Sequence, residues 1–322
     1  DQKAGETRLG RAGGNKMKLL IFGPKARYDQ YRPEFAAALP VETVFCTAHQ
    51  PSLEAAQANP DIEVIFADAI TPVTRELMDA LPRLKLIHSE GVAFNAIDIE
   101  AARERGIFVC NNKGCNAVSV AEHTLMLMLM ALRCGVTGHN AVRAGEQIKF
   151  KESFMISSAP ELGEQTVGMI GLGDIGQAVA RLLRPFGCRL FYYTAHRRPP
   201  EMEAELGVIY RPLKELAQTC DILSLHCAVN EQTTHMVNEA FLAQVKPGTL
   251  LINTARGQLM DNLAVRKALV EGRLGGLAVD TLDPEPTPAD HPLVDLPPEI
   301  AGRAVYSPHL GGLTGGAFRR AH

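Results

Sequence analysis

The stretch TVGMIGLGDIGQAVA, residues 166–180, carries the clearest fold signal in the sequence. Its apolar first half predicts a buried β-strand, and its second half has the spacing of a helix. Gly171, Gly173 and Gly176 form the pattern G-x-G-x-x-G between them. In such a loop the first glycine permits a tight turn, the second lets the backbone approach a diphosphate, and the third lets the helix pack on the strand.

The glycine motif alone is weak evidence for a dinucleotide site, but the segments around it strengthen that interpretation. A diphosphate at the loop would face free N–H groups and the positive end of the helix dipole. A strand before the loop, a helix after it and a further strand at 189–194 favour a dinucleotide site over a glycine-rich turn in an α/β core. The predicted loop contacts are Gly171, Gly173, Asp174, Ile175 and Gly176.

The end of the strand 189–194 indicates which dinucleotide is bound. Sites for NAD usually carry Asp or Glu there, to bind the ribose 2′-hydroxyl. Here the residues are Thr194, Ala195, His196, Arg197 and Arg198. Two adjacent guanidinium groups suit a 2′-phosphate, so we predict NADP as the preferred cofactor, with NAD also accepted. A solvated basic loop that is indifferent to the phosphate is the alternative.

Apolar, β-rich runs alternate with helical stretches along the whole chain, which predicts parallel sheets in an α/β fold. The predicted strands are 18–22, 41–45, 64–67, 84–89, 107–111, 166–171, 189–194, 221–226, 249–254, 276–280 and 304–306. Helices are expected at 174–186 and at 262–272, the second with Asn262 as its cap. Two series of strands predict two domains.

The segment between the two series has two parts. The run 119–133 is too apolar all round for a surface helix and predicts a buried helix at the junction of the domains. The polar stretch 143–164, with Gly145 and Pro160, predicts an irregular surface excursion.

Composition excludes several classes of protein. The 322 residues carry 33 basic and 36 acidic side chains, so a nucleic-acid or anionic membrane partner is not expected. No apolar run approaches the ~20 residues that cross a bilayer. The seven cysteines form no C-x-x-C, read mostly as small core residues and suit a reducing cytoplasm. The histidines lack ligand-type spacing, so no metal is expected. Residues 1–16 are polar and glycine-rich, and we interpret them as a leader or a loose arm.

Three residues follow predicted strands downstream of the glycine loop. Arg256 comes after 249–254, Glu285 follows 276–280, and His309 follows 304–306. Each alone has a structural explanation: a surface charge, a loop acid or a capping histidine. Open α/β sheets bind ligands at the carboxyl ends of their strands, so together they suggest a catalytic group.

At this point the sequence resembles the D-isomer-specific 2-hydroxyacid dehydrogenases. The matching segments, in family order, are EGVAFNAIDIEAARERGIFVCNN, AVSVAEHTLMLML, TVGMIGLGDIGQAVARLLRPFG, DILSLH, KPGTLLINTARGQLMD, GLAVDTLDPEP and SPHLGG. They cover most of residues 60–316. The resemblance implies a flavodoxin-like substrate domain and a Rossmann dinucleotide-binding domain, both doubly wound. Relatives usually continue past the position of His322 with a helix that returns to the first domain.

The resemblance also implies a role for each matching residue. His309 would be the acid/base, Glu285 would pair with it and fix its tautomer, and Arg256 would bind the substrate carboxylate or polarise the keto oxygen. Asp280 would hold the nicotinamide carboxamide. The backbone of Gly91, Val92 and Ala93 would take the substrate carboxylate. The remaining implied cofactor contacts are His226, Thr233 and Thr254.

These roles predict an oxidoreductase that interconverts a small D-2-hydroxy acid and its 2-keto acid. An NADPH-preferring glyoxylate or hydroxypyruvate reductase, working as a homodimer, is the leading hypothesis. The alternatives are a corepressor-like protein that binds dinucleotide without catalysis, and a formate- or phosphite-type dehydrogenase. The expected domains are 17–118 for substrate, with 310–322 returning to it, and 119–309 for NAD(P).

Overall fold

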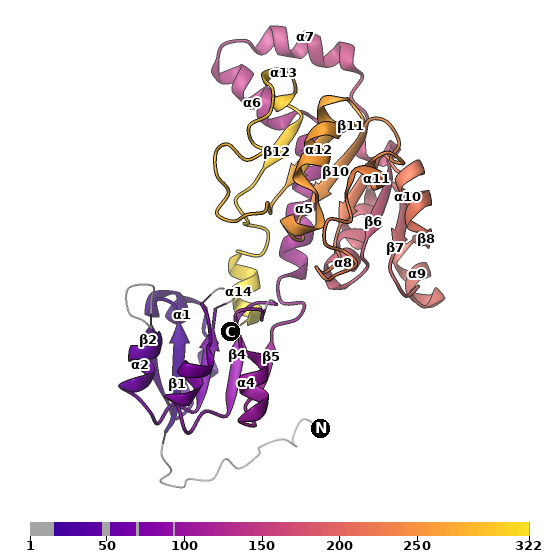
Figure 1. Ribbon diagram of the computed structural model, residues 1–322. Helices are drawn as coiled ribbons and strands as arrows, with labels where there is room; N and C mark the ends of the chain where they lie inside the picture. The colour runs from indigo at the N-terminus through magenta and orange to yellow at the C-terminus, as the bar shows by residue number, and fades with distance from the viewer. Residues whose placement is uncertain (1–15, 47–51, 69–70, 93, 322) are drawn as a thin grey trace, which may run out of the picture. The chain divides into compact units, whose positions relative to one another are not determined.

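A computed structural model describes residues 16–46, 52–68, 71–92 and 94–321 (Figure 1). The chain forms two compact units, one of residues 1–115 and 318–322 and the other of residues 116–317. The sequence predicts domain boundaries between residues 118 and 119 and between residues 309 and 310. Apart from Lys16, the arm predicted for residues 1–16 lies outside the described residues.

The first unit is a five-stranded parallel sheet in the order β2-β1-β3-β4-β5, which is the flavodoxin-like order. Its elements are β1 (Met17–Phe22), α1 (Lys25–Tyr31), the 3₁₀ helix η1 (Glu34–Ala38), β2 (Val41–Cys46), α2 (Ser52–Gln57), β3 (Val64–Ala67), α3 (Arg75–Asp79), β4 (Leu86–Ser89), α4 (Ile99–Glu104) and β5 (Phe108–Asn111). One face of the sheet holds an apolar core around Leu20, Ile65 and Ile87.

The second unit is a seven-stranded parallel sheet in the order β12-β11-β10-β9-β6-β7-β8. Its strands are β6 (Thr166–Ile170), β7 (Arg189–Tyr193), β8 (Val208–Tyr210), β9 (Ile222–Leu225), β10 (Thr249–Asn253), β11 (Leu274–Val279) and β12 (Ala304–Tyr306). Counted from β8, the order within this unit is 3-2-1-4-5-6-7, the Rossmann arrangement with one added strand. The predicted fold class of two doubly wound α/β domains is therefore confirmed.

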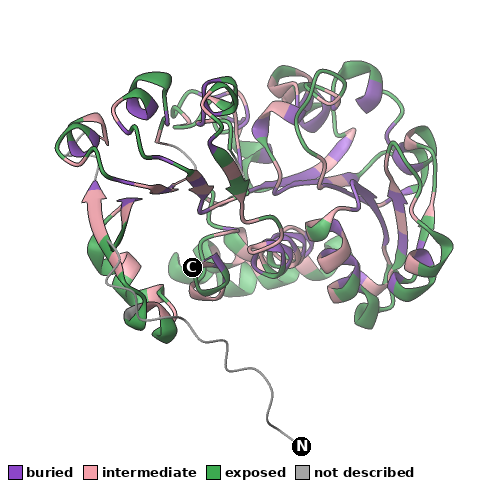
Figure 2. Ribbon diagram, turned by 90° about the horizontal axis from the view of Figure 1, so that it is seen from below, coloured by how far each residue is buried: buried purple, intermediate pink, exposed green. Residues whose placement is uncertain are grey.

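Helices cover both faces of this second sheet, whose strands are mostly buried (Figure 2). The helices are α5 (Ala117–Leu132), α6 (Gly135–Arg143), α7 (Gln147–Ser157), η2 (Leu162–Glu164), α8 (Asp174–Leu183), η3 (Arg184–Phe186), α9 (Pro200–Leu206), α10 (Leu213–Thr219), α11 (Glu239–Leu242), η4 (Gly257–Leu259), α12 (Asn262–Val270), α13 (Pro298–Ala301) and α14 (Gly315–Ala321), whose last residues group with the first unit. Apolar clusters fill both sides of the sheet, one around Leu223 and Leu251 and the other around Met169 and Ile252.

Some local predictions were wrong. The cap of α12 is Asp261, whose carboxylate accepts the N–H groups of Leu263 and Ala264, and not Asn262. The stretch 143–164 is not irregular, because α7 occupies half of it and η2 a further three residues. Two of the seven cysteines, Cys46 and Cys220, are buried and two more, Cys188 and Cys227, pack against the apolar clusters, whereas Cys110 is exposed, contrary to the core position expected for most of them. The three-residue strand β8 was not predicted.

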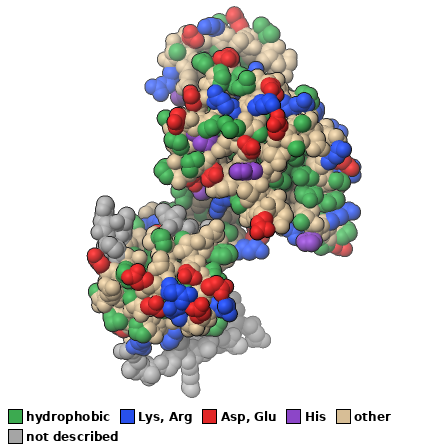
Figure 3. Space-filling model, in the orientation of Figure 1, with side chains coloured by type: hydrophobic (Ala, Val, Ile, Leu, Met, Phe, Trp, Pro, Cys, Tyr) green, Lys and Arg blue, Asp and Glu red, His purple; other side chains and the backbone are tan. Residues whose placement is uncertain are grey.

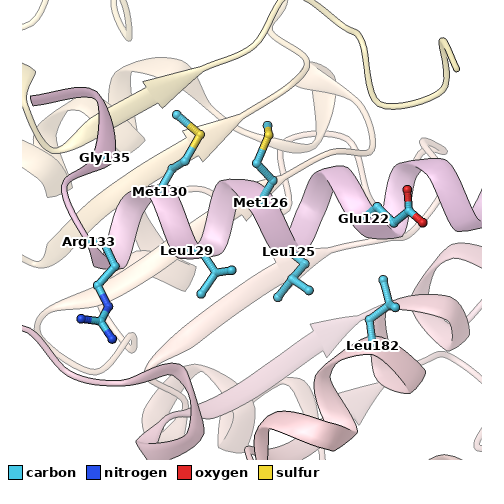
Figure 4. Close-up of a pocket in the computed structure, with 8 residues that line it drawn as sticks. All are labelled: Glu122, Leu125, Met126, Leu129, Met130, Arg133, Gly135 and Leu182. Carbon is cyan, nitrogen blue, oxygen red and sulfur yellow. The ribbon is translucent and has the colours of Figure 1, made fainter. Parts of the chain in front are cut away.

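Helix α5 is buried on one side only, although its composition predicted burial all round. Ala121, Leu127 and Met128 pack into the unit, whereas Met126 is exposed. The open side is a groove of about 570 Å³, shown in Figure 4. It is lined by Glu122, Leu125, Met126, Leu129, Met130, Arg133 and Gly135, together with Leu182 of α8.

Among the described residues no single helix is long and apolar enough to span a membrane, although the bent pair of α5 and α6 meets that requirement together. In the view of Figure 3, acidic and basic side chains are interspersed over the surface of each unit.

Candidate active site

The glycine loop joins β6 to α8 beside the end of β9, where the strand order of the sheet reverses. Gly171 has φ +108°, and a Cβ there would lie 2.5 Å from the carbonyl of His226. A Cβ on Gly176 would lie 2.4 Å from the carbonyl oxygen of Gly171. Both glycines are therefore required by the fold itself, because rigid backbone occupies the space of a side chain.

Gly173 is different, because a Cβ on it would meet no protein atom within 4 Å. It is the N-cap of α8, and no side chain caps this end of the helix. The N–H groups of the first turn are thus available to a ligand, and the space above Gly173 is open. These features fit a diphosphate, while Asp174 is exposed and Ile175 is half-buried at the start of the helix.

The basic segment after β7 differs from the prediction of a two-arginine clamp. The Arg197 guanidinium donates twice to the Glu203 carboxylate of α9, both at 2.8 Å. Glu203 also accepts from the Tyr192 hydroxyl at 2.6 Å. The bonds from Arg197, and then that from Tyr192, lower the pKa of Glu203 to about 2. Arg197 is therefore neutralised by a carboxylate that the sequence analysis did not consider.

Arg198 is placed against the glycine loop instead. Its Nε donates to the carbonyl of Leu172 at 3.2 Å, and its backbone N–H donates to the Tyr192 hydroxyl at 2.9 Å. The Thr194 hydroxyl donates to the carbonyl of His196 at 2.7 Å, closing the turn after β7. Arg198 is thus the arginine of the pair that makes no ion pair among the described residues.

The other implied cofactor residues have partners within the chain. His226 is within 2.9 Å of the Ser224 hydroxyl, and burial lowers the pKa of its imidazole to about 4, so the ring is neutral at pH 7. Thr233 donates to the carbonyl of Ala228 at 2.7 Å and closes the loop after β9. The Thr254 hydroxyl meets that of Thr124 at 2.8 Å.

His309 and Glu285 form a hydrogen-bonded pair after strands β12 and β11. The distances from His309 Nδ1 to the two carboxylate oxygens are 3.1 and 3.0 Å. The two side chains are 45% and 44% exposed, so the pair is open to solvent and to a ligand. A carboxylate can only accept a hydrogen bond, so Nδ1 carries a hydrogen. In the neutral ring Nε2 is therefore unprotonated, and it is the nitrogen that can take up and release a proton.

Arg256 follows β10, the next strand of the sheet, and its side chain is exposed. Its Nη1 donates to the carbonyl of Ala255 at 2.7 Å. The neighbouring Gly257 packs so closely on the loop leading to Glu285 that a Cβ would lie 2.2 Å from the carbonyl carbon of Leu282. The Arg256 loop and the Glu285 loop are therefore held together.

Asp280 is occupied by its own chain. Its carboxylate accepts the N–H groups of Leu310 and Gly311, both at 2.8 Å, and the hydroxyl of Ser307. Both oxygens of Asp280 are engaged within the chain. The side chain anchors the loop that carries His309.

The implied substrate loop lies in the first unit, after β4. The carbonyls of Gly91 and Val92 accept from Asn112 N and Asn111 Nδ2, at 3.0 and 2.6 Å. Their own N–H groups donate to nothing within the described part of the chain. The third implied residue, Ala93, lies outside the described residues.

Sequence reasoning missed Glu203, His123 and Ser307 as members of the site. Glu203 is nine residues beyond Thr194, and no motif marks it. His123 on α5 contacts Ser307 across 184 residues. Contacts at such separation leave no local pattern that a single sequence displays.

Comparison with known proteins gives consistent matches. Residues 125–311 match the model of the D-isomer specific 2-hydroxyacid dehydrogenase, NAD binding domain. The chain is 35% identical over 251 residues to a glyoxylate reductase of Korarchaeum cryptofilum, covering 77% of this chain and 73% of that protein. It is 34% identical over 267 residues to a formate dehydrogenase of Arabidopsis thaliana, covering 82% and 67%. Among solved structures, the D-mandelate dehydrogenase of Rhodotorula graminis has a TM-score of 0.83 at 26% identity, covering 95% and 92%.

Proposed function

The chain belongs to the D-isomer-specific 2-hydroxyacid dehydrogenase family of NAD-linked oxidoreductases, and from this we propose that it reduces a small 2-keto acid, such as glyoxylate or hydroxypyruvate, to the D-2-hydroxy acid. The observation that carries the proposal is the His309–Glu285 pair, at the edge of the sheet that also carries the glycine loop.

The chemistry divides among a few side chains. A nicotinamide dinucleotide, when bound at the glycine loop, supplies the hydride. In the direction of reduction His309 starts as the imidazolium, gives its Nε2 proton to the oxygen on C2 and takes another proton from solvent afterwards, while Glu285 keeps Nδ1–H in place. Arg256 offers charged donors to the carboxylate or the keto oxygen.

We propose that the unit of residues 1–115 and 318–322 binds the substrate and that residues 116–317 bind the dinucleotide. Support for the first role comes from the N–H groups of Gly91 and Val92, which have no acceptor among the described residues and suit a carboxylate.

The test is an assay of the purified chain with glyoxylate, hydroxypyruvate, pyruvate and larger 2-keto acids, each with NADPH and NADH. Consumption of cofactor with a short 2-keto acid supports the proposal. Oxidation of formate without reduction of any keto acid contradicts it and favours a formate-type activity. Tight dinucleotide binding with no turnover of either class of substrate contradicts it and favours the corepressor-like alternative.

We propose a preference for NADPH, with Arg198 as the principal ligand of the 2′-phosphate. The absence of an acid at Thr194 and the position of Arg198 beside the glycine loop support this. Because Arg197 is paired with Glu203, its charge is compensated within the chain. His196 and Thr194 lie on the same turn, which the Thr194 hydroxyl closes by donating to the His196 carbonyl.

Arg198→Ala is expected to lower kcat/KM for NADPH by roughly 10- to 100-fold, the worth of a charged hydrogen bond, and to change the value for NADH little. Arg197→Ala is the matched control and should have the smaller effect on the ratio. Steady-state kinetics with both cofactors make the comparison. A wild-type enzyme that prefers NADH contradicts the proposal, as does an equal effect of the two substitutions.

We propose that the protein forms a homodimer through α5 and α7. Helix α7 has no buried residue, and Ile148, Met155 and Ile156 on it are 64–84% exposed. An eleven-residue helix that packs so little is marginal alone. The groove on α5 adds four apolar side chains, and exposed patches of this kind mark interfaces. A two-fold symmetric copy is the commonest partner.

Met155→Glu is expected to convert dimers to monomers, because a buried unpaired carboxylate opposes association. Light scattering coupled to size exclusion measures the mass. Leu263→Glu, at an exposed leucine on α12, is the control and should leave the mass unchanged. A wild-type chain that is monomeric at micromolar concentration contradicts the proposal.

We also propose a reducing compartment, the cytoplasm being the simplest. All seven cysteines are free, and none forms a disulfide.

A further inference from the structure

The loop Ser307–Gly311 holds His309 in an unusual backbone conformation. His309 has φ +57°, in the left-handed region that costs energy for a residue with a Cβ. Its N–H donates to the carbonyl of Asp280 at 2.9 Å, and the next two N–H groups, of Leu310 and Gly311, donate to the Asp280 carboxylate. This one aspartate therefore fixes the backbone on and after the histidine.

The approach of Asp280 to the loop is close. A Cβ on Gly311 would lie 2.9 Å from Asp280 Oδ2 and 3.7 Å from the ring of His123. Ser119 of α5 also donates to the carbonyl of Gly311, at 2.5 Å. The loop is thus packed tightly between Asp280 and one face of α5.

His123 completes this arrangement from α5. Its Nε2 is 2.7 Å from the Ser307 hydroxyl and 3.2 Å from Asp280 Oδ1. Because Ser307 donates its own proton to Asp280, it accepts from His123, so Nε2 of His123 carries a hydrogen. The side chains of Asp280 and His123 are 2% and 14% exposed. Burial of a carboxylate costs free energy unless hydrogen-bond donors compensate it, so each donor around Asp280 matters.

We propose that His123 is a positioning residue for His309. By donating to Ser307, which in turn donates to Asp280, and by lying 3.2 Å from Asp280 Oδ1, it holds the carboxylate in the orientation that binds the N–H groups of Leu310 and Gly311. That backbone in turn sets the direction of the His309 ring, so that Nδ1 meets Glu285. The inference deepens the proposed reaction and rests on the proposed role of His309 in it.

The experiment compares His123→Leu, which removes the donor, with His123→Gln, whose amide nitrogen can replace Nε2. For His123→Leu we expect kcat to fall about tenfold or more, the worth of one hydrogen bond, with the Kd for NADPH within about threefold of wild type. His123→Gln is expected to recover most of kcat. His139→Gln, at an exposed histidine on α6, should leave kcat unchanged.

A double-mutant cycle separates positioning from a general loss of structure. If His123 acts through His309, then His123→Leu has no further effect on the residual rate of His309→Gln. An equal loss in both backgrounds overturns the inference, as does a kcat of His123→Leu within twofold of wild type, or a failure of His123→Gln to recover activity.

Further variants distinguish a failure of the inference about His123 from a failure of the proposed function. Should His123→Leu not fold, Ser307→Ala breaks the same chain of hydrogen bonds and takes its place, with the same fall in kcat expected. Full activity in His309→Gln contradicts the proposed function itself. A large loss in His309→Gln beside normal activity in His123→Leu contradicts only the inference about His123.

Discussion

Replacing His309 with Gln is expected to lower kcat for 2-keto acid reduction by about 10²–10⁴-fold, the usual contribution of a positioned acid/base. Glutamine keeps a polar side chain of similar size but cannot carry a proton to the substrate oxygen. The Kd for the dinucleotide should stay close to that of wild type, because the glycine loop lies at another position on the sheet edge. Stopped-flow kinetics and fluorescence titration measure the two quantities.

Glu285→Gln is the companion variant for this prediction. Its amide can still accept from His309 Nδ1, but it no longer offers a negative charge to the imidazolium that donates the proton during reduction. A smaller loss than for His309→Gln is therefore expected. A His309→Gln enzyme within a few-fold of the wild-type kcat would falsify the proton-transfer role.

Gly173→Ser is expected to weaken dinucleotide binding by roughly tenfold or more while leaving the fold intact, since the side chain has open space and no neighbour to displace. The backbone at Gly173 has φ −80°, which serine adopts without strain. The serine hydroxyl can also cap α8 by accepting an N–H group of its first turn. The Tm of the unliganded protein should thus be unchanged or higher, while isothermal titration shows the lost affinity.

Gly176→Ala is the opposite case in the same loop. Its Cβ would lie 2.4 Å from a rigid carbonyl oxygen, so strand and helix must separate. Overpacking of this kind costs about 1–3 kcal/mol, which corresponds to a fall of several degrees in the Tm of a chain of this size. If Gly173→Ser binds NADPH normally, or if Gly176→Ala is as stable as wild type, the assignment of the two glycines is wrong.

Local pattern predicted most of the architecture. The continuous apolar runs and the glycine loop predicted two parallel sheets, because a strand that is covered on both faces needs apolar residues throughout. Strand β8 was not predicted, because three residues at a sheet edge are too few to show a pattern of apolar residues. Helix α7 was missed for another reason: none of its residues is fully buried within its unit, so the sequence shows no strong apolar stripe there.

Local sequence patterns are enough to predict the order of the elements, the position of the glycine loop and the placement of Arg256, Glu285 and His309 after strands. These follow from short-range rules, in which strand, turn and helix are specified by adjacent residues. Long-range packing, in contrast, sets which charged side chains remain free to bind a ligand. It paired Arg197 with Glu203, occupied both oxygens of Asp280 and brought His123 against Ser307. A side chain's partners depend on how distant elements pack, and that packing is a property of the folded chain as a whole.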